Sequence, residues 1–294
     1  MRAIILQTSS YRVFLLLFMC QSFCVAQDVS DQTFADYLFR EGEYYRAITE
    51  YYRMLQVESD HQNRAFLLRK IGNCYFQGED YEGYLVFINK NMNDLCSDTL
   101  LCAEMNLYRG KSYYYLDRFQ EAIHTLDSQQ LKPSNPFFND AQFLMAISYS
   151  RNDDWTNAVE ELQRIKRRNS EVDGIRAENI IRSFQNYQKK STKSPFLAGG
   201  LSAVIPGSGY AYCQHWGTAI ASLFVNGLLV WTFADALRQE QYGLASLTGF
   251  VGIGWYGGNI WGSARAARRY NAHLRDDYIN SILMRENLLE YLKD

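Results

Sequence analysis

Histidine is scarce in this 294-residue sequence, and its four histidines are not spaced as pairs of metal ligands. They are His61, His124, His215 and His273. The sequence also lacks a nucleophile elbow, a zinc-protease helix motif and a dinucleotide fingerprint. The adjacent acidic pairs Asp153–Asp154 and Asp276–Asp277 are typical of solvated turns and faces. We therefore expect neither enzymatic activity nor a cofactor.

The chain carries almost no net charge, with a formal value of −2, so composition gives no reason to expect nucleic acid as a partner. These charges are unevenly placed along the chain. Residues 28–193 are densely charged and rich in tyrosine, whereas only Asp235, Arg238 and Glu240 are charged within residues 195–264. This contrast predicts a water-soluble part followed by a membrane part.

The first 26 residues have the features of a secretory signal peptide. Arg2 and Arg12 are positively charged, residues 13–20 (VFLLLFMC) form a short apolar core, and Ala26 ends a short stretch of small residues. The core is too short for a transmembrane helix, which needs about 20 apolar residues. We expect cleavage after Ala26 and export of the chain from Gln27 onward, with an uncleaved anchor as the alternative.

Four cysteines remain after such cleavage, and an exported domain permits disulfides. Cys96 and Cys102 lie six positions apart between two predicted helical units. They form either a bridge or two separate thiols, and the sequence leaves both readings open. Cys74 lies on a predicted buried helix face, where we expect a small core residue.

One pattern recurs four times in the first half of the chain, which makes internal repetition the main structural signal. A turn and an aromatic residue are followed by a small residue and an aliphatic one. The four segments are residues 42–48 (GEYYRAI), 79–85 (EDYEGYL), 117–123 (DRFQEAI) and 153–159 (DDWTNAV). Each follows a helix-like stretch that contains a small residue, such as Gly72 or Gly110.

This pattern resembles the tetratricopeptide repeat family over residues 27–170, with about four repeats. The resemblance implies an all-α solenoid of antiparallel helix hairpins, which pack closely where small residues meet at the helix crossings. The departures are a spacing of 36 to 38 residues instead of about 34, the missing terminal proline, and Tyr84 at a position where the family has alanine. Residues 171–194 are expected to cap the last repeat and link it to the membrane part.

The resemblance also implies that the concave groove binds a protein or peptide partner. The family's groove-facing positions fall here on Asp36, Arg40, Arg69, Asn73, Lys111, Tyr114 and Arg151. Arg69, Lys111 and Arg151 either form a basic stripe that favours an acidic peptide or a terminal carboxylate, or are ordinary solvated side chains.

Residues 195–263 are expected to form the membrane domain, with a short broken helix and two spanning helices at residues 217–237 and 242–263. The Pro-Gly-x-Gly run at residues 206–209 resembles a small membrane domain of uncharacterised bacterial envelope proteins. Gly254, Gly258 and Gly262, at four-residue spacing, predict a smooth helix face that packs on the first spanning helix or on a second copy of the chain.

Residues 264–294 are expected to form an amphipathic tail helix that begins with Arg265, Arg268 and Arg269. The signal peptide and two crossings put this tail on the exported side, whereas the arginines favour the cytoplasm, where we place it. The sequence thus predicts a bacterial-envelope scaffold, bound to the lipid bilayer, whose exported (periplasmic) repeats bind protein partners. The alternative is an auxiliary factor in membrane-protein insertion or transport.

Overall fold

The computed structural model describes residues 34–96, 98–127, 134–168, 171–288 and 292, and the predicted signal peptide lies outside them. The described residues form helices and turns and contain no strand. The chain divides into two compact units, one of Met1–Glu178 with Asn287–Asp294 and one of Asn179–Glu286. Each unit is described by itself.

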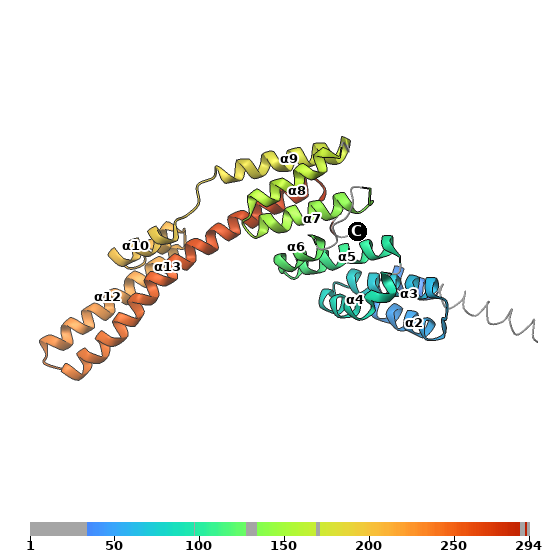
Figure 1. The fold of residues 1–294 in the computed structure, drawn as a ribbon. Helices are drawn as coiled ribbons and strands as arrows, with labels where there is room; N and C mark the ends of the chain where they lie inside the picture. Colours follow the sequence, from blue (N-terminus) through green and yellow to red (C-terminus); the bar gives the residue numbers. More distant parts are fainter. Residues whose placement is uncertain (1–33, 97, 128–133, 169–170, 289–291, 293–294) are drawn as a thin grey trace, which may run out of the picture. The chain divides into compact units, whose positions relative to one another are not determined.

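The first unit is a series of helix hairpins that follow the helical residues 34–40 (Figure 1). Consecutive helices pack against one another from α2 to α8, as a helical-repeat solenoid requires. The helices are α2 (Tyr44–Val57), α3 (His61–Gln77), α4 (Tyr81–Leu95), α5 (Thr99–Tyr115), α6 (Phe119–Asp127), α7 (Phe138–Arg151) and α8 (Trp155–Arg167), and α9 (Glu171–Gln188) begins in this unit.

The repeated sequence segments begin at equivalent turns of the hairpins. Gly42, Glu79, Asp117 and Asp153 all have a left-handed backbone, with φ between 57° and 78°. In each case the next helix begins two residues after the left-handed residue. Asp80 and Asp154 accept hydrogen bonds from the backbone N–H of the third residue along, Gly83 and Asn157, and so cap α4 and α8. The spacing seen in the sequence is therefore the spacing of these turns.

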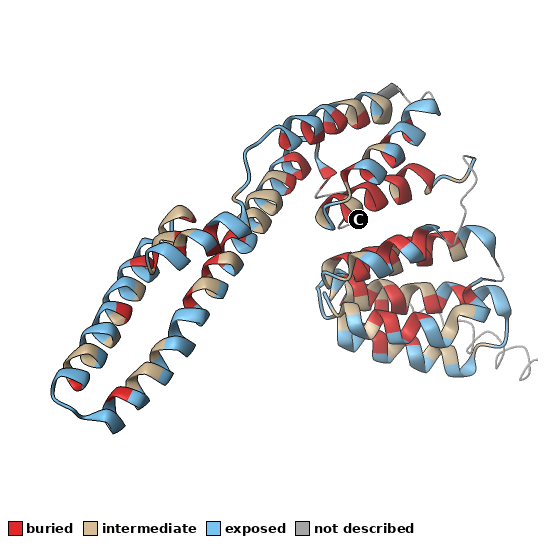
Figure 2. Cartoon of the chain, turned by 60° about the vertical axis from the view of Figure 1, so that its left-hand side comes forward, coloured by how far each residue is buried: buried red, intermediate tan, exposed pale blue. Residues whose placement is uncertain are grey.

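Small residues lie at the helix crossings, as the repeat pattern predicts. Ala47, Ala122 and Ala158 are completely buried, and buried residues run along the facing sides of the helices of this unit (Figure 2). The second repeat differs: Tyr84 replaces the alanine, and its ring lies against Gly72, where an added Cβ would approach within 3.3 Å. The Tyr84 hydroxyl donates to the Met105 carbonyl over 2.8 Å, so the buried ring carries no unpaired polar group.

The second unit contains the end of α9 and four further helices, α10 (Pro195–Val204), α11 (Ser208–Tyr212), α12 (Trp216–Arg238) and α13 (Tyr242–Arg285). We expected one helix at 242–263 and a separate tail helix at 264–294, but α13 continues without a break to Arg285. The segment around Ala264 contains no proline, and alanine and arginine are strong helix formers.

The distal part of α13 packs on the end of α9. The rings of Tyr187 and Tyr278 lie 5.2 Å apart, and the Tyr278 hydroxyl donates to the Ser183 carbonyl over 3.0 Å. Ile279, Ile282 and Leu283 are buried on this side of α13, as expected for the apolar face of an amphipathic helix.

The Pro-Gly-x-Gly run forms a tight reversal between α10 and α11. Gly207 has φ 89°, and an added Cβ would lie 2.2 Å from the Ala219 carbonyl oxygen. A Cβ on Gly209 would lie 1.9 Å from the Ala198 carbonyl oxygen, and the Gly209 N–H donates to Ser202 Oγ over 3.0 Å. Glycine is needed at both positions because backbone atoms of neighbouring helices occupy the space of a side chain.

The glycine face predicted on α13 makes no contact with α12. A Cβ added at Gly254 or Gly258 would meet no atom within 4 Å, so neither residue packs on α12. Gly262 packs on Tyr210, which precedes α12. Instead, Gly249 faces α12, where an added Cβ would lie 3.1 Å from the Phe233 ring.

Among the described helices, α12 is the one that is long and apolar enough to cross a membrane. Little of it is buried by the rest of the chain, unlike the core helix of a soluble protein.

Candidate functional site

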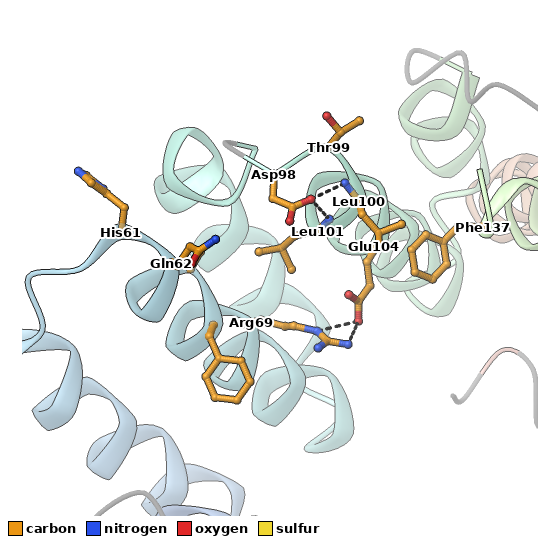
Figure 3. A pocket seen from close by; sticks show the side chains of 11 residues that line it. His61, Gln62, Arg69, Asp98, Thr99, Leu100, Leu101, Glu104 and Phe137 are labelled. Carbon is orange, nitrogen blue, oxygen red and sulfur yellow. Dashed lines mark hydrogen bonds and ion pairs between the residues drawn. The ribbon is translucent and has the colours of Figure 1, made fainter. Parts of the chain in front are cut away.

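A groove of about 880 Å³ opens between α3 and α5 in the first unit (Figure 3). Side chains from α3, from the start of α5 and from the residue before α7 line it. They are His61, Gln62, Ala65, Phe66, Arg69, Asp98, Thr99, Leu100, Leu101, Glu104 and Phe137. Of the predicted groove residues, only Arg69 belongs to this set.

Arg69 in this groove is part of an ion pair and is not a free cation. Arg69 Nε and Nη2 both donate to Glu104 Oε1, over 2.9 Å and 2.6 Å. The Arg69 side chain remains 43% exposed, whereas that of Glu104 is 12% exposed. Glu104 therefore neutralises the positive charge that the sequence assigned to this position.

The other two residues of the predicted basic stripe, Lys111 and Arg151, also make contacts with side chains of the same unit. Lys111 is only 4% exposed, and its Nζ lies 4.8 Å from the centre of the Tyr108 ring. Arg151 Nε donates to the Tyr114 hydroxyl over 3.3 Å. The three cations do not form an exposed stripe for an acidic peptide.

The remaining predicted positions have different environments. Asp36 accepts hydrogen bonds from the Tyr51 hydroxyl and from Lys70 Nζ, the latter over 3.2 Å. Asn73 is half-buried, and its Oδ1 has no hydrogen-bond partner among the described residues. Arg40 is exposed.

Polar contacts link the first helix of each repeat to the first helix of the next. The pairs are Asp36–Lys70, Arg69–Glu104, Tyr114–Arg151 and Asn139–Asp173, at sequence separations of 34, 35, 37 and 34. Several positions predicted to contact a partner instead join neighbouring repeats. In the sequence, these contacts correspond to pairs of complementary polar residues that lie one repeat apart. Such pairs are found only when successive repeats are compared with each other.

The surface that remains free in the groove is largely apolar. Phe66 is 39% exposed and Leu100 is 51% exposed, whereas phenylalanine and leucine in the core of this chain are almost completely buried. Asp98 caps α5 by accepting from the Leu100 and Leu101 N–H groups, over 2.7 Å and 3.2 Å. The groove thus combines exposed apolar side chains with a neutralised ion pair, which suits an apolar segment of a partner.

A disulfide joins Cys96 and Cys102 across the turn between α4 and α5. The bridge flanks Asp98 and Leu100 in sequence, so it constrains the segment that forms one edge of the groove. Cys74 and Cys213 are free and buried. Burial raises the pKa of the Cys74 thiol to about 12, so this cysteine stays protonated and unreactive at neutral pH.

One buried carboxyl lies outside the groove. Glu161 of α8 is 4% exposed, and burial raises its pKa to about 7, although Arg164 Nη1, 3.2 Å away, acts in the opposite direction. The described residues contain no group of three or more histidine, cysteine, aspartate or glutamate side chains that could hold a metal ion. We assign Glu161 no role in binding.

Comparison with known proteins adds one match. The sequence profile of the tetratricopeptide repeat matches residues 140–171, which comprise most of α7, all of α8 and the first residue of α9. The match supports a tetratricopeptide repeat at these residues. The sequence matches no curated protein and no solved structure. Tetratricopeptide repeats bind proteins, so the match supports protein–protein interaction as the role of the repeat unit.

Proposed function

We propose that this protein is a membrane-anchored, non-enzymatic scaffold of the bacterial envelope whose repeat unit binds an apolar segment of a partner protein. The groove between α3 and α5 is the observation that carries the proposal, because it is a large concave surface with exposed apolar side chains. The partner segment would place an apolar side chain between Phe66 and Leu100. The Arg69–Glu104 pair would offer it polar contacts at the base.

The second unit supports membrane anchoring through its exposed apolar surface. Many large apolar side chains of α12 and of the uncharged part of α13 are exposed, and contiguous apolar surface of this kind is rare on water-soluble proteins. Examples are Phe224 (71%), Trp231, Phe250, Ile253 and Trp261. The 23 residues of α12 span about 35 Å, enough for a hydrocarbon layer of about 30 Å.

The path of the chain supports two crossings. The Ser194 N–H donates to the Tyr212 hydroxyl over 3.3 Å, so the α10–α11 pair begins and ends at one level and does not cross. α12 then crosses, and α13, which packs along it, returns. In this arrangement the distal part of α13 returns to the side on which α10 begins, which is the alternative to a cytoplasmic tail.

Two features support export of that side. The first is the predicted signal peptide at residues 1–26. The second is the Cys96–Cys102 disulfide, because such bonds persist in oxidising compartments outside the cytoplasm.

Site-specific photo-crosslinking in living cells tests partner binding. A photoreactive amino acid at Leu100 lies in the groove, and one at Val86 of α4, which is 70% exposed, is the control outside it. We expect one dominant crosslinked partner from Leu100 and none from Val86. We also expect Phe66→Asp to abolish that crosslink without changing the amount of protein in the membrane. Equal crosslinking from both positions would contradict a groove-specific partner.

A cavity of about 360 Å³ between α12 and α13 favours a role in membrane-protein insertion or transport as a second candidate. Its lining is apolar apart from the side chains of Asn226 and Thr248 and the hydroxyl of Tyr256. In that case a photoreactive residue at Val230, in the cavity lining, would crosslink to many nascent membrane proteins. A scaffold predicts no such products.

A further inference from the structure

Six basic side chains lie where the apolar part of the second unit ends. Three precede α10, and three follow the uncharged stretch of α13. They are Lys189, Lys190, Lys193, Arg265, Arg268 and Arg269. Lys193 is half-buried and the other five are exposed. We call this set the basic belt.

Contacts with α13 bring the two halves of the belt together, although they are far apart in the sequence. The Lys193 N–H donates to Asn271 Oδ1 over 2.8 Å, and Asn271 Nδ2 donates to the Lys193 carbonyl over 2.8 Å. Asn271 comes two residues after Arg269 on the same helix. The backbone at Lys193 is thereby fixed within about one helical turn of Arg268 and Arg269.

Aromatic rings lie against three of these cations, and one of them, Lys190, has its Nζ 4.3 Å from the centre of the Tyr278 ring, further along α13. Lys193 Nζ lies 4.4 Å from the centre of the Tyr212 ring, and the Arg268 guanidinium lies 5.8 Å from the Trp261 ring. Trp216, at the start of α12, is also largely exposed near this end. Tryptophan and tyrosine concentrate at the headgroup level of a bilayer, so the rings mark this end of the unit as an interface.

The belt has no counter-charges within the described part of the chain. No ion pair joins any of its six side chains to a described carboxylate. Asp235 and Glu240 lie at the opposite end of α12. Asp276 and Asp277 come later on α13, and Asp276 already pairs with Arg275 over 3.2 Å. The belt is therefore a concentrated positive surface that requires anions from outside the chain.

We propose that the basic belt binds the headgroups of anionic phospholipids at this end of the second unit. This inference rests on the proposed membrane anchoring and names the lipid class that the anchor selects. Clusters of lysine and arginine next to an apolar helix attract acidic headgroups, and each such cation strengthens the association roughly fivefold. Arginine in particular forms paired hydrogen bonds with phosphate oxygens.

The belt also accounts for a conflict in the charge distribution. Basic residues next to membrane helices normally stay in the cytoplasm, whereas the signal peptide and the disulfide place this side outside it. Cations that oppose this rule need another source of stabilisation, and anionic headgroups in the outward-facing leaflet supply it.

Competitive lipid binding tests the proposal on the full-length chain. The protein is purified in a nonionic detergent and mixed with equal amounts of dioleoylphosphatidylglycerol and dioleoylphosphatidylcholine, and bound lipids are counted by native mass spectrometry. The belt variant carries Arg265→Gln, Arg268→Gln and Arg269→Gln. The control carries Arg46→Gln, Arg53→Gln and Arg238→Gln, which remove the same charge from the repeat unit and from the opposite end of α12.

We expect the native chain and the control to retain phosphatidylglycerol at least roughly tenfold over phosphatidylcholine, and the belt variant, which keeps the three lysines, to lose most of this preference. The preference should weaken as salt rises from about 50 to about 500 mM, because ions screen charges at an exposed surface. Equal melting temperatures without lipid establish that the variants are folded.

Three results would overturn the inference. One is a belt variant that keeps its lipid preference, and another is a native chain without a preference. The third is displacement of phosphatidylglycerol by double-stranded DNA, which would make the belt a nucleic-acid surface. In each case membrane anchoring itself would stand. A chain that stays soluble without detergent would instead overturn the proposed function.

Discussion

Gly110 provides a direct test of how the repeat helices pack. It lies in α5, and an added Cβ would lie 2.9 Å from both Cγ and Cδ2 of Leu126. Leu126 is 3% exposed, so its side chain has no open space into which it can turn. Gly174, in α9, would meet no atom within 4 Å after the same change. Replacing each glycine by alanine therefore separates crowding from helix propensity.

Alanine stabilises a helix interior by about 1 kcal/mol relative to glycine, whereas an extra methyl group in a packed core costs about 1 to 3 kcal/mol. We expect Gly174→Ala to raise the free energy of unfolding by about 1 kcal/mol. Gly110→Ala should leave it unchanged or lower it by up to about 2 kcal/mol. The difference between the two variants measures crowding against Leu126.

Thermal unfolding of the full-length chain in detergent, followed by circular dichroism, measures both variants. A third variant combines Gly110→Ala with Leu126→Val, which makes room for the new methyl group. We expect this pair to be less destabilised than the sum of its parts by about 1 kcal/mol, because the two side chains are in contact. Equal stabilisation by both glycine substitutions would refute the packing described for α5 and α6.

Three further predictions concern single residues. Burial raises the pKa of Glu161 from 4.5 to about 7, so the native state favours its protonated form. The stability that this form gives is complete below pH 4.5 and is lost as pH rises through about 7. As pH rises across this range, the free energy of unfolding of Glu161→Gln should therefore increase relative to that of the native chain, by at most about 3 kcal/mol. Denaturant titrations at several pH values measure this difference, and a difference that stays constant with pH would contradict the raised pKa of Glu161. Glu79 has φ 58°, so Glu79→Gly should raise stability by about 0.5 to 1 kcal/mol in thermal unfolding, and a loss of stability would argue against the left-handed turn. Gly209→Ala should destabilise the detergent-solubilised chain by about 3 kcal/mol because the new Cβ meets the Ala198 carbonyl, while Gly200→Ala, which meets nothing, should be harmless.

Much of the repeat unit is predictable from sequence because its signals are local. The turn at Glu79 and the aromatic residue that comes after it recur with the helix hairpin itself, so their spacing alone predicts the hairpins. Tyr84 departs from the family pattern, yet Gly72 on the neighbouring helix compensates for its size. Only the structure shows that these two residues face each other.

The candidate site was less predictable because its charges are paired across repeats. Family positions identify Arg69 as facing the groove, but its partner Glu104 lies 35 residues away on the next repeat. The α13 glycines show a similar limit. Four-residue spacing places Gly254 and Gly258 on one face, but the packing of Gly249 against Phe233 turns that face away from α12. Helix rotation depends on all contacts along the helix.

In the proposed topology, α12 and α13 cross a membrane, and the segment before α10 lies on the same side as the distal part of α13. Labelling of single introduced cysteines with an impermeant maleimide in sealed vesicles tests it. The variants are Ser191→Cys, Gln239→Cys and Ser281→Cys, all at exposed positions, and the free cysteines of the described chain are buried and give little background. The account predicts that positions 191 and 281 label from the same side and position 239 only from the other. Labelling of all three from one side would contradict it.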